Sequence, residues 1–78
     1  AKYQGNWVSG KPEGFGTEFA ANGSIYKGHF LAGLKQGEGK ITFATGSFYE
    51  GQWDSDEMKG IGTYQWKNGM IYHGEWNQ

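Results

Sequence analysis

The chain has 78 residues, no cysteine and no arginine, and its seven lysines against eight acidic residues give a net charge of −1. A chain of this length forms one small domain, and without cysteine it has no disulfide to stabilise it. The balanced charge argues against a nucleic-acid-binding protein, and the apolar runs are too short to span a membrane.

Glycine and aromatic residues are both abundant, and they belong to a repeat of 23 residues. Tyrosine opens each unit, glycine follows two residues later, and Trp or Phe follows two residues after that, as at Tyr26, Gly28 and Phe30. All 15 glycines fit one template, Tyr-x-Gly-x-(Trp/Phe)-x-x-Gly-x-x-x-Gly-x-Gly-x6-Gly-x-x. We therefore divide residues 1–78 into one array with units 3–25, 26–48 and 49–71 and a partial unit 72–78. We expect the array to be a segment of a longer array or of a larger protein.

Each unit is predicted to open with a β-strand. Tyrosine, glycine and Trp/Phe at i, i+2 and i+4 share one face of a strand, and the residues between them, such as Lys27 and His29, are mostly polar. A second strand begins at the Gly-x-Gly pair, where bulky residues such as Ile41 and Phe43 follow the glycines on the same face. A ring from a neighbouring strand would lie over the bare glycine backbone, which explains glycine inside a strand.

Two kinds of connection alternate along the chain. Asn22-Gly23, Thr45-Gly46 and Asn68-Gly69 predict hairpin turns between one unit and the next. The connection inside a unit, such as residues 31–36, is expected to be a longer loop. The predicted fold class is all-β: an elongated single-layer antiparallel meander of stacked β-hairpins, with about seven short strands.

Two sites depart from the template. In the first unit, Glu18 and Ala20 replace bulky residues, while Phe15 and Phe19 have the opposite parity. A bulge or a frayed first hairpin would account for this, and so would an apolar patch facing a partner. In the third unit, Asp56 replaces a template glycine, so its loop is expected to differ from its counterparts.

The segments 26–30 (Tyr-Lys-Gly-His-Phe) and 49–53 (Tyr-Glu-Gly-Gln-Trp) carry the pattern of the MORN (membrane occupation and recognition nexus) repeat family, which the whole chain resembles. The resemblance implies a MORN-repeat solenoid, an elongated twisted sheet of stacked hairpins. It also implies protein–protein scaffolding, or attachment to acidic phospholipids, in a cytoplasmic protein at the periphery of the cytoskeleton or a membrane. No catalytic residue carries over, because enzymatic activity in this family lies in other domains.

We expect a non-enzymatic scaffold that binds a peptide or helix along an aromatic-lined groove, or pairs with a strand at an open sheet edge, where it could also self-associate. Exposed aromatic side chains are typical interface anchors. The candidate partner-binding residues are Tyr26, Phe30, Tyr49, Trp53, Trp66, Tyr72, Trp76, Phe15 and Phe19. The alternative is peripheral binding to acidic phospholipids, including phosphoinositides, through Lys2, Lys27, Lys40 and Lys59. Carbohydrate binding is a third hypothesis.

Other chemistry finds little support in the sequence. The Gly-x-Gly pairs lack the lysine and Ser/Thr of a phosphate-binding loop. His29 and His73 fall on predicted polar faces, and Asp54, Asp56 and Glu57 have too few oxygen ligands for a calcium loop. No set of residues supplies a nucleophile with its base, so we expect no enzyme, no cofactor and no metal site.

Overall fold

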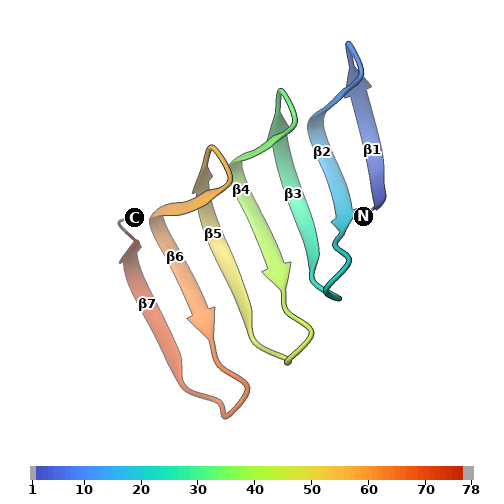
Figure 1. Ribbon diagram of the computed structural model, residues 1–78. Helices are drawn as coiled ribbons and strands as arrows, with labels where there is room; N and C mark the ends of the chain where they lie inside the picture. Colours follow the sequence, from blue (N-terminus) through green and yellow to red (C-terminus); the bar gives the residue numbers. More distant parts are fainter. Residues whose placement is uncertain (1, 77–78) are drawn as a thin grey trace.

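A computed structural model, which describes residues 2–76, forms a single seven-stranded antiparallel sheet (Figure 1). Each strand pairs with its neighbours in sequence, and the sheet extends over 40 × 24 × 17 Å. The predicted all-β meander is confirmed. The strands are β1 (Lys2–Val8), β2 (Lys11–Phe19), β3 (Ile25–Leu31), β4 (Leu34–Thr42), β5 (Phe48–Asp54), β6 (Glu57–Gln65) and β7 (Ile71–Trp76).

A row of glycines crosses the whole sheet. Each strand contributes one glycine, and each glycine is the register partner of the next, in the order Gly5, Gly16, Gly28, Gly39, Gly51, Gly62 and Gly74. The 23-residue period therefore becomes a straight line of bare backbone perpendicular to the strands. Side chains from neighbouring rows fill the space that this line leaves.

The tyrosine that opens each unit lies over this row. A methyl group added at Gly39 would overlap the ring of Tyr26, and one at Gly62 would overlap the ring of Tyr49. The Tyr26 hydroxyl donates a 2.9 Å hydrogen bond to the carbonyl of His29, where the ladder between β3 and β4 shifts register. The hydroxyl thus crosses the glycine and adds a hydrogen bond where the backbone ladder is interrupted.

The tyrosines and the template Trp/Phe residues form one continuous chain of edge-to-face rings. Tyr26 lies between Phe30 (5.1 Å between centroids) and Trp53 of the next unit (5.2 Å), with interplanar angles of 84° and 83°. Such pairs contribute about 0.5–1.5 kcal/mol beyond their buried area. The ring chain runs through Trp7, Tyr3, Phe30, Tyr26, Trp53, Tyr49, Trp76 and Tyr72.

The centre of this ring chain is the hydrophobic core. Tyr26, Phe30, Tyr49 and Trp53 are each no more than 5% exposed. The Trp53 indole N–H donates to the carbonyl of Gly39 at 3.1 Å, so its burial leaves no polar atom unpaired. A single-layer sheet therefore has a core because the tryptophan of one unit lies across the backbone of the preceding unit.

The lengths of the connections reverse the prediction. Within a unit the strands are joined by two-residue turns, such as Ala32-Gly33, whose φ angles of 52° and 88° match the type I′ turn of tight hairpins. Between units, Asn22-Gly23 lies in a loop of five residues, 20–24 (at the lower end of the strands in Figure 1). The Asn22 side chain accepts a hydrogen bond from the Ser24 N–H, so asparagine stabilises the loop as an Asx turn.

A bulge or frayed hairpin specific to the first unit is not observed. The register between β1 and β2 shifts between Gly5 and Trp7, which is the template position where β3–β4 and β5–β6 shift as well. The parity difference is real, because Phe15 pairs with His29 and is 57% exposed on the face opposite the rings.

We predict that Gly39→Ala lowers the free energy of unfolding by roughly 1–3 kcal/mol, the range for forcing extra volume into a packed site. The added methyl group would displace the Tyr26 ring, which has no free space to enter. Gly74→Ala is the matched control, because its neighbour Tyr72 is 42% exposed and free to move. Urea denaturation of both variants tests this, and equal losses would contradict the packing of tyrosine over glycine.

Candidate functional site

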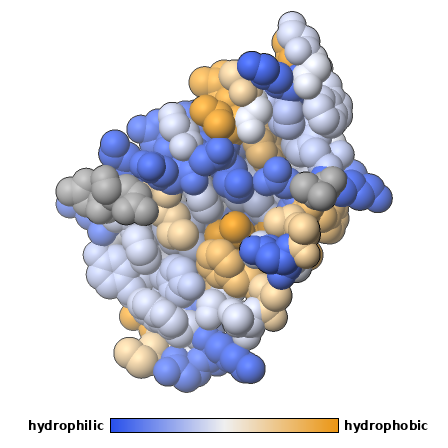
Figure 2. All heavy atoms as spheres, viewed as in Figure 1, coloured by the Kyte–Doolittle hydropathy of each residue, from blue (hydrophilic) through white to orange (hydrophobic). Residues whose placement is uncertain are grey.

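The two faces of the sheet differ in chemistry. Register partners lie on the same face, so one row of side chains reads Tyr3, Glu18, Tyr26, Ile41, Tyr49, Tyr64 and Tyr72. We call the face that carries this row the aromatic face, and the opposite one the polar face. Figure 2 shows, on the side of the molecule in view, hydrophobic side chains in separate patches divided by hydrophilic ones.

The nine candidate partner-binding residues fall into three groups. Tyr26, Phe30, Tyr49 and Trp53 form the core and present almost no surface to a partner. Trp66 and Tyr72, each 42% exposed, and the partly buried Trp76 present ring surface at the β6–β7 end. Phe15 and Phe19 belong to the polar face, where Phe15 makes an edge-to-face contact of 5.6 Å with His29.

Besides exposed template rings such as Trp7 and Tyr72, three template positions between the tyrosines contribute accessible surface to the aromatic face. Of the residues at these positions, only Trp66 was a candidate. Their residues are Glu18, Ile41 and Tyr64 at the first, Ala20, Phe43 and Trp66 at the second, and Pro12, Lys35 and Met58 at the third. The sequence could have identified these residues, because side chains alternate between the two faces of a strand. Each of them is an even number of positions from the second glycine of its Gly-x-Gly pair and so lies on the same face.

The third unit concentrates aromatic surface at these positions. The Tyr64 ring lies 4.6 Å from Trp66 and 6.0 Å from Phe43, and we call these three residues the aromatic patch. An open hollow of about 480 Å³ adjoins it, lined by Ser47, Trp66, Lys67 and Asn68. The patch is thus a rigid apolar surface beside a space that a side chain of a partner could enter.

The two departures from the template converge on one lysine. The Lys35 ammonium lies 3.2 Å from Glu18 and 3.8 Å from Asp56, and 5.4 Å from the centre of the Tyr26 ring. We call Glu18, Lys35 and Asp56 the charged cluster. It joins three units on the aromatic face.

The hydrogen bonds of Asp56 explain why aspartate replaces glycine at this template position. Its carboxylate accepts a 2.7 Å hydrogen bond from the Lys35 N–H, and its own N–H donates to the Lys35 carbonyl at 2.9 Å. In the preceding unit the equivalent pair is Gly33 and Pro12, and proline has no N–H that needs an acceptor. The turn at Ser55-Asp56 keeps the shape of its counterparts, with φ angles of 50° and 72°, so the expected difference in loop structure is wrong.

The side chains of the acidic turn already bind protein groups. Asp54 accepts a hydrogen bond of 3.1 Å from the Gln36 amide and lies 3.9 Å from Lys59. Gln36 in turn accepts from the Ser55 N–H at 3.0 Å, and one unit earlier Glu13 does the same for Ala32. Among residues 2–76 no group of three His, Asp or Glu side chains is placed to hold a metal ion.

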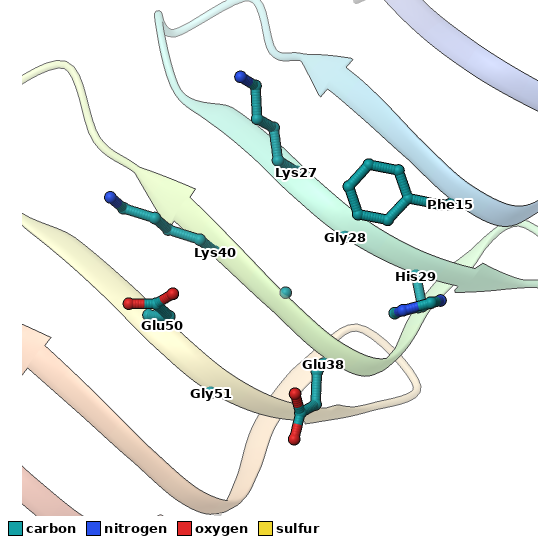
Figure 3. A pocket seen from close by; sticks show the side chains of 9 residues that line it. Phe15, Lys27, Gly28, His29, Glu38, Lys40, Glu50 and Gly51 are labelled. Carbon is teal, nitrogen blue, oxygen red and sulfur yellow. The ribbon is translucent and has the colours of Figure 1, made fainter.

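The polar face carries a shallow depression of about 320 Å³ with mixed charge (Figure 3). Lys27 and Lys40 are register partners on β3 and β4, while Glu38 and Glu50 line the same depression. Of the four candidate lipid-binding lysines, this brings two together. Lys2 lies on the first strand, and Lys59 lies on β6 close to Asp54.

Neither histidine is buried. His29 and His73 are exposed, and the His73 ring nitrogen Nδ1 lies 2.6 Å from the Thr63 hydroxyl. In the part of the chain that the structure describes, no helix is long and apolar enough to cross a membrane.

Burial changes the ionisation of two core tyrosines. Burial raises the pKa of Tyr26 well above its ordinary value of 10.0, and the nearby Asp56 and Glu18 carboxylates raise it further, against the hydrogen bond to His29. Burial also raises the pKa of Tyr49, which its hydrogen bond to the Gln52 carbonyl partly offsets. Both groups bind a proton more tightly in the folded protein than in the unfolded chain.

These features together define a β-repeat scaffold, in which stacked hairpins share one ring-over-glycine core. The family model for the MORN repeat matches three consecutive segments, residues 3–25, 26–48 and 49–71. The chain belongs to the MORN repeat family, as its resemblance predicts. MORN repeats are generally non-enzymatic modules that act as repeat scaffolds, often in protein or membrane binding. A search of the curated proteins finds no match to the chain.

The tyrosine pKa shifts predict a loss of stability at alkaline pH. Because the folded pKa values lie above the unfolded value, this stability is fully present below about pH 10 and is lost as the pH rises above it. Tyr26→Phe should make that decline shallower, after an initial loss of about 0.5–1.5 kcal/mol from the missing hydrogen bond. Urea midpoints between pH 8 and 11 measure the slope, and Tyr72→Phe, which removes the equivalent hydrogen bond to Glu75, is the control. A slope that Tyr26→Phe leaves unchanged would contradict the prediction.

Proposed function

We propose that the chain is a non-enzymatic scaffold that binds a protein partner, a peptide or a helix, across its aromatic face. The observation that supports the proposal is the aromatic patch, whose Trp66 is 42% exposed while the rings of the core are covered. Large rings held rigidly beside an open hollow are the usual anchors of protein interfaces. Tyr64 packs against the core, whereas Trp66 keeps an exposed ring surface that a partner would cover.

Rigidity supports the same proposal. The patch rests on Trp76 through Tyr64, with 5.8 Å between ring centroids, and Trp76 contacts the core ring of Tyr49 at 5.3 Å. A preorganised surface loses little conformational entropy when a partner binds.

The scaffold would act in the cytoplasm, at the periphery of the cytoskeleton or a membrane. Pairing of a partner strand, or of a second copy, along the edge of β7 would be a second contact of the same scaffold.

Binding to acidic phospholipid is the second candidate function. Its support is the cross-strand pair Lys27 and Lys40, since two like charges directly opposite favour an anion between them. Glu38 and Glu50 in the same depression offset that charge. Lys27→Glu combined with Lys40→Glu should abolish any pelleting with anionic vesicles at low salt, whereas pelleting that survives both substitutions would remove this site.

Selection from a displayed library of random peptides on the immobilised chain tests the protein-binding function. We predict that the selected peptides lose affinity for Trp66→Ala by roughly tenfold or more, as for an interface anchor. They should keep their affinity for Ile61→Ala, because Ile61 is similarly exposed, at 47%, but lies on the polar face. Peptides that bind both variants equally, with both folds intact by circular dichroism, would contradict the use of the aromatic face.

A further inference from the structure

The aromatic face changes character from one end to the other. At two template positions the residues become larger and more aromatic along the array, from Glu18 through Ile41 to Tyr64 and from Ala20 through Phe43 to Trp66. Because each set occupies equivalent places in consecutive units, the change forms a gradient across the strands. At these two positions the β2 end carries glutamate and alanine, and the β6 end carries tyrosine and tryptophan.

Charge adds to this difference at Glu18. Glu18 belongs to the charged cluster, which extends through Lys35 on β4 to Asp56 in the turn before β6 and contains two carboxylates and one ammonium group, a net charge of −1. The Lys35 side chain is 19% exposed, whereas those of Glu18 and Asp56 are 36% and 45% exposed, so the cluster presents mainly carboxylate oxygen to solvent. At the other end, Lys67 lines the hollow beside Trp66.

We infer that the aromatic face selects an amphipathic peptide with a fixed direction. A basic side chain of the peptide contacts Glu18, and an apolar anchor near its other end docks on the aromatic patch, with an acidic residue beyond the anchor facing Lys67. This inference rests on the proposed function and adds to it the chemistry and orientation of the partner. An acidic partner segment at the β2 end would be repelled by the exposed carboxylates.

The geometry also sets the spacing within the partner. Four strand intervals separate β2 from β6, which at about 4.8 Å each gives roughly 19 Å between the two contacts. A helical peptide covers that distance in about 13 residues and returns to the same face at about 14, and an extended peptide covers it in about six. Glu18 and Tyr64 lie in one register row, so the partner axis crosses the strands.

The test uses two synthetic helical peptides that share a tryptophan anchor and differ only about 14 residues away, on the same helix face as the anchor, one with arginine and the other with glutamate. Fluorescence anisotropy should give tighter binding of the arginine peptide, and Glu18→Gln should weaken it by about two- to fivefold, the range of an exposed ion pair. Glu75→Gln, an exposed carboxylate of the polar face, is the matched control and should leave affinity unchanged.

The outcomes separate this inference from the proposed function. Equal affinity of the two peptides, with equal loss for both on Trp66→Ala, overturns the direction and leaves the scaffold function standing. Failure of both peptides to bind overturns the direction as well. Only when the library selection also fails does the proposed function fall with it.

Discussion

Contact between each tyrosine ring and a pair of facing glycines is the interaction on which the rest of the structure depends. It places Tyr26 over Gly39 and brings its edge against Trp53 of the next unit, so neighbouring units share one core. A side chain at the glycine would lift the ring and separate the units. Stability in such an array comes from interfaces between neighbours, which is why a sheet only one layer thick can bury four aromatic residues.

The same packing decides which side chains remain for binding. The template rings in the middle of the sheet, such as Tyr26 and Tyr49, are buried in the core, and the positions between them are free to differ. These variable positions hold Glu18 at one end of the aromatic face and Tyr64 and Trp66 at the other. Residues such as Glu18 and Trp66 therefore distinguish the units from one another, while the tyrosines and glycines form the common fold.

The period, the strands and their faces are predictable from the sequence, because tyrosine, glycine and tryptophan alternate with polar residues at a fixed interval. The connection lengths are not, since Ala32 adopts a positive φ of 52° that alanine rarely takes, and no local signal marks it. Packing of the rings over glycine is also predictable from the repeat, but the sequence does not distinguish the buried Trp53 from its template equivalent Trp7, which is 56% exposed. Lys35 could not be identified as the partner of Glu18 and Asp56 without the register, which joins residues up to 21 positions apart.

Proton chemical shifts of the glycine row test the central claim most directly. A hydrogen on Cα that points at the face of an aromatic ring is shielded by the ring current. We predict that the α-protons of Gly39 and Gly62 resonate well upfield of the ordinary glycine range, while those of Gly10 and Gly69, which have no neighbouring atom within 4 Å of an added Cβ, stay within it. Ordinary shifts at Gly39 and Gly62 in the folded protein would contradict the packing of tyrosine over glycine, and with it the shared core of the array.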